Sequence, residues 1–238
     1  MKEFEHNKLP LFYMTPPAPC PYLDDKVERK VFTHLSGSGA DGLNDTLTHA
    51  GFRRSQNILY KHSCDDCRAC ISVRVKAQAF SASSGFKRVI RKNNDLSRTR
   101  LKAETHKKQF ELLSKYLDQR HKDGGMSDMS IFDYMAMVED TCVDTHLVEY
   151  HTPDNTLVAV SLIDRLSDGL SMVYSFYDPE LDKRSLGTFM ILDQIQQTVE
   201  AGLDYLYLGY WIEGCEKMVY KQRFNPLEKL TEIGWEPF

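Results

Sequence analysis

The chain has 238 residues, 42% of them hydrophobic and 27% charged, which suits a globular protein of one large domain or two small ones. Its apolar runs fall short of the roughly 18–20 residues that cross a bilayer, and its first residues lack the basic-then-apolar pattern of a secretory signal. Six cysteines, three of them clustered, suit a reducing compartment better than a disulfide scaffold. We therefore predict a cytoplasmic protein with no membrane partner. The net charge of −4 argues against indiscriminate binding of nucleic acid.

The first third of the chain predicts a small lobe. Five prolines among residues 1–21 favour an extended arm. Alternating residues predict a strand over 27–34, then a glycine-rich loop at 36–42 and a short helix at 45–51 that ends at Gly51. Further strands are expected at 58–60 and 71–75, on either side of a cysteine cluster. A stretch rich in Ser at 81–85 marks a boundary, so we expect an amino-terminal Cys-containing lobe over residues 1–85 and a second domain over 86–238.

The second domain predicts a meander, a helix and a strand in that order. Apolar residues at helical spacing first predict two helices, at 110–117 and 131–138, with a loop at 121–125 between them. Strands follow at 146–150, 157–166 and 170–177, joined by turns at 153–155 and 167–169. A helix at 185–202 and a strand at 205–210 complete the series. This is the core order of the acetyltransferase-like (GNAT) fold, so we predict an α+β protein with a GNAT-like acyl-transfer domain and the smaller lobe before it.

The start of the predicted helix at 185–202 carries part of a phosphate-binding turn. In GNAT-like folds this helix points its amino end at phosphate through a Gln/Arg-x-x-Gly-x-Gly/Ala turn. Arg184 and Gly187 match that pattern, whereas Phe189 stands where a small residue lets pyrophosphate approach. The turn therefore favours an anionic ligand and weakens the case for coenzyme A.

Three thiols at a spacing of three residues, Cys64, Cys67 and Cys70, form a pattern that chance rarely produces. Thiolates at this spacing can converge on one zinc ion or iron–sulfur cluster, and Cys20 is the available fourth ligand. The alternative is a group of free, partly buried thiols in a compact lobe. The spacing alone leaves both interpretations open.

A basic stretch follows the predicted boundary. This stretch contains nine basic residues and only two acidic ones, Asp95 and Glu104. Such a local basic patch on an otherwise acidic protein favours docking on one defined polyanion. The alternative is a solvated helix face. The nine cations are Lys87, Arg88, Arg91, Lys92, Arg98, Arg100, Lys102, Lys107 and Lys108.

Taken together, these motifs resemble the aminoacyl-tRNA–protein transferase family. The amino-terminal motifs are Gly51-Phe52-Arg53-Arg54-Ser55, Tyr60-Lys61 and the cysteine run. The carboxy-terminal ones are 174–179, 185–187 and 208–212, with Cys215, Lys217-Met218 and Tyr220-Lys221. The short chain and the C-x-x-C-x-x-C form are similar to the bacterial aspartate/glutamate leucyltransferase branch. The longer eukaryotic relatives transfer arginine, so leucine is expected and arginine stays open.

The resemblance implies both a reaction and a set of site residues. The chain would move an amino acid from charged tRNA to the α-amino group of proteins that begin with Asp or Glu, which marks them for N-degron degradation. The ester is already activated, so the chemistry needs no cofactor. The implied roles are catalysis by Asp178 and Tyr174; acceptor binding by Arg54, Lys61, Lys217 and Lys221; a pocket wall of Tyr60, Tyr210 and Tyr220; and tRNA binding by Lys87, Arg88, Arg91, Arg184 and Gly187. Cys215 is expected to be a structural thiol, not a nucleophile.

Two rival functions fit parts of the same pattern. The first is a coenzyme A-dependent N-acetyltransferase on the same fold, against which Phe189 and the basic stretch count. The second is a non-enzymatic, metal-bound module that recognises acidic amino termini or RNA. Transfer of a labelled amino acid from charged tRNA to a peptide that starts with Asp would distinguish an aminoacyl transferase from both rivals.

Overall fold

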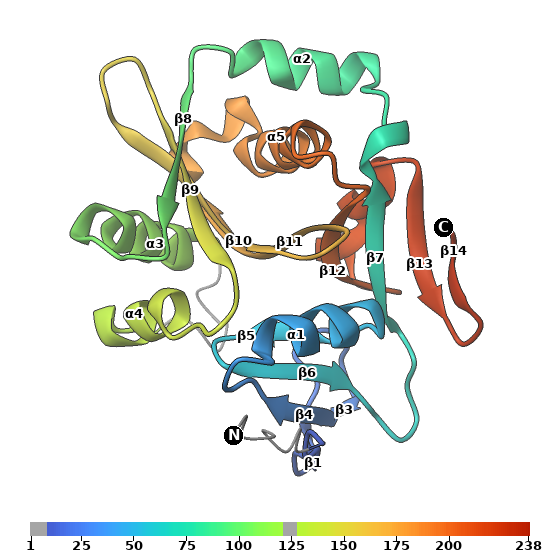
Figure 1. Ribbon diagram of the computed structural model, residues 1–238. Helices are drawn as coiled ribbons and strands as arrows, with labels where there is room; N and C mark the ends of the chain where they lie inside the picture. Colours follow the sequence, from blue (N-terminus) through green and yellow to red (C-terminus); the bar gives the residue numbers. More distant parts are fainter. Residues whose placement is uncertain (1–8, 121–127) are drawn as a thin grey trace, which may run out of the picture.

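A computed structural model describes residues 9–120 and 128–238 of the chain. An eight-stranded sheet forms its centre (Figure 1). The sheet has the order β14-β13-β7-β12-β11-β10-β9-β8. Its strands are β7 (Cys70–Lys76), β8 (Ser97–Lys102), β9 (Thr145–His151), β10 (Leu157–Arg165), β11 (Gly169–Tyr177), β12 (Tyr205–Ile212), β13 (Leu227–Thr231) and β14 (Gly234–Pro237).

Helices cover both faces of this sheet (Figure 1). On one face lie α5 (Leu186–Glu200) and α2 (Ser84–Lys92), and on the other α3 (Lys107–Arg120) and α4 (Ile131–Glu139). Strand β10 serves both layers, because Val160 and Leu162 belong to the core under α3 and α4, while Ala159 and Ile163 belong to the core under α5. Short 3₁₀ turns, η1 (Ala77–Ala79), η2 (Pro179–Arg184) and η3 (Glu216–Arg223), connect the elements.

The amino-terminal lobe lies on the α3 side of the large sheet (Figure 1). Its four-stranded sheet has the order β1-β4-β6-β5, and a separate hairpin pairs β2 with β3. Helix α1 packs on this lobe around Leu47 and Leu59. The elements are β1 (Tyr13–Met14), β2 (Ala18–Pro19), β3 (Val27–Glu28), β4 (Lys30–His34), α1 (Ala40–His49), β5 (Arg53–Ser55) and β6 (Ile58–His62).

The predicted fold class is confirmed: an α+β chain with a GNAT-like domain and a smaller Cys-containing lobe. The antiparallel meander β9-β10-β11, helix α5 and the return strand β12 stand in the predicted order. The predicted loop at 36–42 is too long, because α1 begins at Ala40. The predicted loop at 121–125 lies outside the described residues. Strand β7 precedes the predicted boundary at residue 85 but belongs to the large sheet, and the boundary itself stays a prediction.

Three strands of the large sheet, β8, β13 and β14, had no sequence prediction. Strand β8 reads Ser-Arg-Thr-Arg-Leu-Lys and pairs only with β9, so as an edge strand it needs no apolar alternation. Among the residues that the structure describes, no helix has the length and apolar content to cross a bilayer.

A buried ion pair joins the lobe to the large sheet. Arg54 of β5 grips the carboxylate of Asp164 on β10 with two hydrogen bonds, from Nε to Oδ2 at 2.5 Å and from Nη2 to Oδ1 at 2.6 Å. The two side chains are only 1% and 2% exposed. Thr145 donates to the same carboxylate at 2.8 Å, so both charges are fully compensated away from water.

We expect Arg54→Met to lower the free energy of unfolding by about 3–5 kcal/mol, because it strands the buried Asp164 carboxylate without its partner. Urea denaturation measures this value. The double variant Arg54→Met with Asp164→Leu should recover much of the loss, since no buried charge then remains. Equal losses in the single and double variants would show that packing, and not the unpaired charge, carries the effect.

Candidate active site

The large sheet opens between β11 and β12. These two strands pair in parallel over only three residue pairs, from Gly169 with Tyr205 to Ser171 with Tyr207. Beyond this point each strand carries an irregularity against its other neighbour. In β11 the register with β10 skips Val173, and in β12 the register with β7 skips Leu208. Bulges of this kind are common beside functional sites, because they end a ladder and redirect side chains.

Arg53 of the amino-terminal lobe enters this opening. Its Nη2 donates to the carbonyl of Val173 at 3.0 Å, and the carbonyl of Met172 lies 3.5 Å away. The guanidinium also lies 5.9 Å from the centre of the Tyr210 ring. Gly209 makes the space, since a Cβ there would lie 1.8 Å from Nη1 of Arg53, and its φ of +70° suits glycine.

Tyr210 anchors the loop and strands that carry Arg53. Its buried hydroxyl lies 3.0 Å from the carbonyl oxygen of Gly51 and 3.3 Å from that of Tyr60, one on each side of Arg53 in sequence. Lys61 adds a bond from Nζ to the carbonyl of Ala50 at 2.8 Å, and burial lowers the pKa of this lysine. The position of Arg53 is therefore set by contacts between the two lobes.

Lys221 lies fully buried on the other side of the opening. Its Nζ donates to the carbonyl of Tyr210. Burial and then the nearby Arg53 guanidinium lower the pKa of Lys221 well below its ordinary value. The Arg53 guanidinium beside it stays protonated, because the ordinary pKa of a guanidinium is above about 12.

Four tyrosines gather along the far half of β11. They are Tyr174 and Tyr177 on β11, Tyr116 on α3 and Tyr220 on η3. The rings of Tyr116 and Tyr177 meet edge-on at 5.1 Å. Burial, followed by these three neighbours, raises the pKa of Tyr116. Burial also raises the pKa of Tyr174 to about 12, so its hydroxyl keeps its proton at neutral pH and can donate a hydrogen bond.

Asp178 closes β11 with an ion pair. Lys115 of α3 places Nζ 2.8 Å from Oδ1 of Asp178 and 2.8 Å from Oε2 of Glu180. Asp178 also accepts a bond from the amide of Glu180 at 3.0 Å, which caps η2. Hydrogen bonds to these two carboxylates raise the pKa of Lys115. The carboxylate of Asp178 is thus paired and serves the turn that leads into α5.

The start of α5 lies between the tyrosines and helix α2. A Cβ on Gly187 would lie 3.1 Å from the Tyr177 ring, so glycine allows this ring to rest on the first turn of α5. Arg184, before the helix, grips Asp95 with two bonds at 2.8 and 2.9 Å. Asn93 at the end of α2 donates to the carbonyl of Arg184 at 2.9 Å. The contacts tie the end of α2 to the start of α5.

Helix α2 presents a basic outer face. Phe86 is buried in the core, whereas Lys87, Arg88 and Arg91 are exposed. A hollow of about 410 Å³ lies on this helix and is lined by Ser84, Lys87, Ile90 and Arg91. Phe189 lies in the first turn of α5, where it is partly buried and its ring packs on that of Tyr150 at 5.7 Å. Its expected effect on a phosphate stays a prediction.

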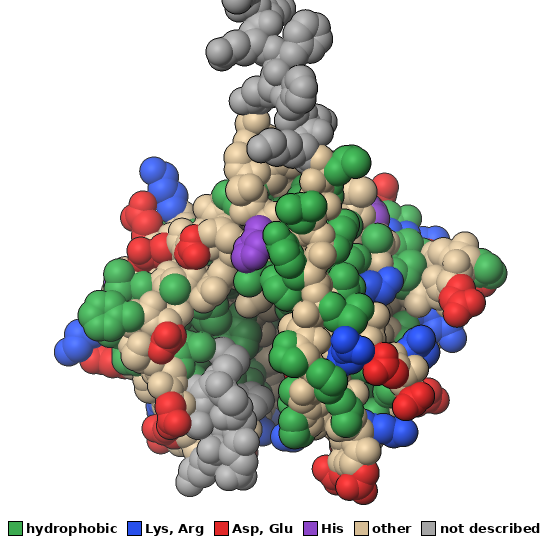
Figure 2. All heavy atoms as spheres, turned by 90° about the horizontal axis from the view of Figure 1, so that it is seen from below, with side chains coloured by type: hydrophobic (Ala, Val, Ile, Leu, Met, Phe, Trp, Pro, Cys, Tyr) green, Lys and Arg blue, Asp and Glu red, His purple; other side chains and the backbone are tan. Residues whose placement is uncertain are grey.

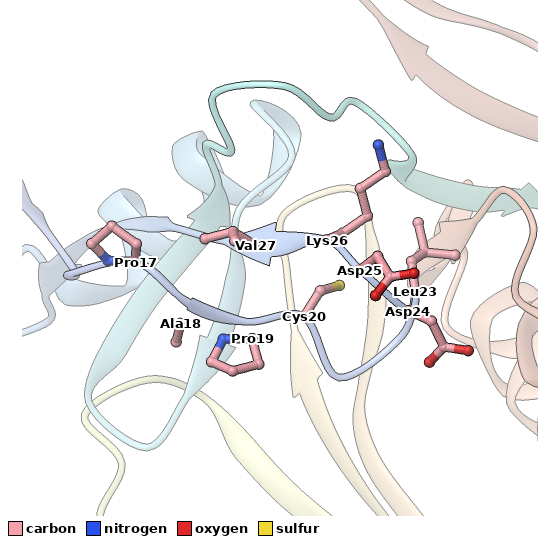
Figure 3. A pocket seen from close by; sticks show the side chains of 9 residues that line it. All are labelled: Pro17, Ala18, Pro19, Cys20, Leu23, Asp24, Asp25, Lys26 and Val27. Carbon is pink, nitrogen blue, oxygen red and sulfur yellow. The ribbon is translucent and has the colours of Figure 1, made fainter.

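The four predicted metal-binding thiols lie near one another. Burial, then the proximity of Cys64, Cys20 and Cys67, raises the pKa of Cys70 to about 12. Within residues 9–120 and 128–238, however, no three Cys, His or acidic side chains are arranged to hold a metal ion. Cys20 lines a hollow of about 740 Å³ along the β2–β3 hairpin (Figure 3). The thiols therefore share a neighbourhood without forming a preformed metal site.

The face that carries the amino-terminal lobe is rich in hydrophobic side chains (Figure 2). The first described residues contribute to the exposed apolar area, with Leu9, Leu11 and Phe12 among them. These residues lie before β1 and contact the lobe itself, since the ring of Phe12 lies 5.9 Å from that of Phe52 and Thr33 donates to the carbonyl of Leu11.

The structure brings some predicted site residues together and separates others. Tyr174, Tyr220 and Asp178 lie along or beside the far half of β11, while Tyr60, Tyr210 and Lys221 lie where the lobe meets β12. Arg54 is enclosed by Asp164, and Lys217 is exposed on η3. Sequence reasoning missed Arg53, Lys115, Tyr116 and Tyr177. Arg53 had a signal, because it adjoins Arg54 in the same motif and adjacent strand residues face opposite ways.

Comparison with known proteins adds a decisive observation. Residues 18–88 match the family described as "Arginine-tRNA-protein transferase, N terminus", and residues 108–231 match "Arginine-tRNA-protein transferase, C terminus". The chain belongs to the arginine-tRNA-protein transferase family. The resemblance predicted from the motifs is therefore confirmed.

Members of this transferase family similar to the chain over nearly its full length are named "Aspartate/glutamate leucyltransferase". The protein of Parvibaculum lavamentivorans is 53% identical over 235 residues, which cover 99% of this chain and 98% of that protein. The protein of Nitrobacter winogradskyi is 54% identical over 240 residues, which cover 97% and 93%. A solved structure, that of L-PGS from Bacillus licheniformis, matches 60% of this chain and 46% of its own with 11% identity and a TM-score of 0.46, too weak a likeness to support an argument.

We expect Gly209→Ala to destabilise this transferase more than Gly202→Ala. Both glycines have φ near +70°, so each substitution costs about 1–2 kcal/mol of backbone strain, but only the Cβ at 209 collides with Arg53. Gly202 has open space around the position of a Cβ and is the matched control. Chemical denaturation gives both values.

The cause of that difference can be isolated with a double variant. Arg53→Ala with Gly209→Ala should be less destabilised than the sum of the two single variants, because removal of the guanidinium removes the collision. Additive losses would mean that Arg53 does not occupy the space that Gly209 leaves.

Proposed function

We propose that this protein transfers leucine from leucyl-tRNA to the α-amino group of proteins that begin with Asp or Glu. The observation that carries the proposal is the identity above 50%, over almost the whole chain, with proteins named aspartate/glutamate leucyltransferase. Their name also favours leucine over arginine as the transferred residue. Charged tRNA is made in the cytoplasm, which is where we place the reaction.

The reaction is the aminolysis of an ester. The neutral α-amine of the acceptor attacks the leucyl carbonyl, an N–C bond forms, and the C–O bond to the terminal ribose breaks. The proton lost by the amine ends on the departing ribose oxygen. An α-amino group titrates near pH ~7.7–8.0, so a sizeable fraction is neutral without a strong base. Positioning of the two reactants therefore supplies most of the catalysis, and no acyl-enzyme is needed.

Tyr174 is suited to stabilise the tetrahedral intermediate. Its hydroxyl is protonated at neutral pH, since burial raises its pKa to about 12, and a fixed donor can serve a developing oxyanion. Tyr220 and Tyr177 would then wall the leucyl ester or stack on the terminal adenine. Lys217 is exposed on η3 beside this group and remains available to an acidic acceptor or to RNA.

Asp178 acts, on this proposal, as a positioning residue. Asp178 lies five positions after Val173, a rise of about 16 Å along an extended chain, so one acceptor residue cannot reach both. Its carboxylate holds Lys115, which fixes α3 against the turn before α5. Proton abstraction by Asp178 would first require that ion pair to open.

The RNA would approach over α2 and the start of α5. Lys87, Arg88 and Arg91 supply exposed cations, and the carboxy end of α2 is bonded to the turn that precedes Gly187. Arg184 takes part through its pairing with Asp95, which fixes this turn. The acceptor stem would thus lie on α2 while its 3′ end reaches the tyrosines.

A zinc ion or iron–sulfur cluster on Cys20, Cys64, Cys67 and Cys70 would be structural on this proposal. Cysteine sulfur is a suitable ligand for either group, but among the described residues no three of these side chains are arranged to hold a metal ion. No step of the transfer uses it, because the ester supplies its own activation.

We expect purified protein to move radiolabel from leucyl-tRNA into a peptide that starts with Asp, and not into the same peptide starting with Ala. Filter binding after hydrolysis of the tRNA measures the peptide label. Arginyl-tRNA in parallel tests the choice of amino acid. Acetyl transfer from acetyl-CoA to the peptide, with no effect of tRNA, would contradict the proposal, as would peptide binding without transfer.

We expect Arg88→Gln with Arg91→Gln to weaken leucyl-tRNA binding several-fold and to leave the Michaelis constant of the peptide unchanged. Each lost phosphate contact should reduce the slope of log affinity against log salt by about 0.9. Titrations from 50 to 200 mM salt measure it. The control carries Lys26→Gln with Arg165→Gln, which removes the same charge from other exposed sites. The same loss in this control would assign the effect to net charge and not to α2.

A further inference from the structure

We propose that Arg53 binds the side-chain carboxylate of the acceptor's first residue and so selects Asp and Glu. The inference rests on the proposed function, which names acidic amino termini as acceptors without naming the group that reads them.

Arg53 is a half-buried cation without an anion. Among the described residues its guanidinium forms no salt bridge, and its bonds run from Nη2 to main-chain carbonyls. Other arginines of this fold are paired, as Arg54 is with Asp164, Arg74 with Glu228 and Arg98 with Asp193. A guanidinium withdrawn from water and left unpaired is costly, so its site is suited to an incoming anion.

The donors that remain match a carboxylate. Nε and Nη1 of Arg53 donate to no described acceptor, while Nη2 bonds the carbonyls. A carboxylate binds a guanidinium edge with two parallel bonds, and each such edge includes Nη2, so the carboxylate would pair one of the two free donors with an N–H of Nη2. Its neighbours include the ring of Tyr210 at 5.9 Å, Tyr220, on whose pKa the charge of Arg53 acts, and the buried Lys221, whose pKa that charge lowers. An aromatic surrounding of low polarity strengthens such an ion pair.

The other cations near the opening are engaged or poorly placed. Arg54 is enclosed by Asp164, Lys61 donates to Ala50, and Lys221 is buried against the carbonyl of Tyr210. Lys217 is exposed on η3, where water weakens a single ion pair. Arg53 differs from the other four because it is a partly buried guanidinium, with Nε and Nη1 free of described acceptors.

The location of Arg53 also fits the chemistry. Its guanidinium bonds the carbonyl of Val173, and the next residue is Tyr174, whose hydroxyl is the candidate donor to the oxyanion. A first residue held by its carboxylate at Arg53 would therefore lie where β11 leaves its pairing with β12, on the strand that carries Tyr174. The close packing against Gly209 holds the guanidinium in place before the acceptor binds.

The test compares peptides that differ only in Asp or Asn at the first position. We measure kcat/KM for leucyl transfer to each, in the full-length wild type, Arg53→Gln and Arg53→Lys. Arg53→Gln should lower the value for the Asp peptide about 10- to 100-fold and change that for the Asn peptide little, since it removes a charged hydrogen-bond pair. Arg53→Lys should be intermediate, because it keeps the charge but loses the fork.

Arg165→Gln is the matched control, an exposed arginine with the same substitution, and it should keep the Asp preference of the wild type. Affinity for leucyl-tRNA should be unchanged in both Arg53 variants. An equal loss for Asp and Asn peptides in Arg53→Gln, or an Asp preference that survives in both variants, would overturn the inference.

A second measurement separates this inference from the proposed function. Calorimetric binding of the two peptides without tRNA should favour Asp in the wild type and lose that preference in Arg53→Gln. If the wild type binds in this way but transfers no leucine, the proposed function fails and the role of Arg53 stands. If transfer to Asp peptides occurs and binding is indifferent to Arg53, the inference fails and the function stands.

Discussion

The parting of β11 from β12 is the constraint on which the rest of the site depends. Two parallel strands that separate leave main-chain carbonyls without ladder partners, and such groups need other donors when they are buried. Here side chains supply them. Arg53 donates to Val173 from the amino-terminal lobe, and Lys221 donates to Tyr210 from η3. The opening is therefore stable only because two cations from distant parts of the chain complete it.

Those two basic groups respond differently to burial. Burial and the field of Arg53 both lower the pKa of Lys221. A guanidinium stays protonated, because its ordinary pKa is above about 12. The permanent charge of Arg53 therefore lies at the opening, 5.9 Å from the centre of the Tyr210 ring. On the proposed role of Arg53, such a site would discriminate between a carboxylate and an amide more sharply than an exposed lysine could.

Neighbouring arginines on β5 divide two tasks between them. Arg54 points into the sheet interface and holds the lobe through Asp164, while Arg53 points into the opening. The resemblance implied that Arg54 binds the acidic residue of the acceptor, whereas in the structure its carboxylate partner is the protein's own Asp164. Which of two adjacent arginines faces outward depends on the phase of a three-residue strand, and this phase is set by pairing with β6 and contact with β11.

The sequence was informative where elements are local and periodic. The meander, α5 and β12 could be predicted because apolar alternation and helical spacing run through them, with turns of recognisable chemistry between. Edge strand β8 could not, since a polar strand carries no such pattern. Tyr116 and Lys115 were also out of reach. Their positions look like an ordinary helix face until α3 is placed beside β11, and that placement depends on long-range packing of Leu113 and Leu117.

On the proposed function, the opening would let one sheet serve two large substrates. Helices α2 and α5 cover one face, where the exposed cations would meet RNA, and the amino-terminal lobe with Arg53 covers the other. A continuous sheet would keep these faces apart, because its ladder leaves no passage between strands. With the ladder ended after Ser171 and Tyr207, the 3′ end of the RNA and the acceptor's first residue would meet within the sheet itself. The proposed reaction needs nearness more than it needs a strong base, and the interrupted ladder would provide that nearness.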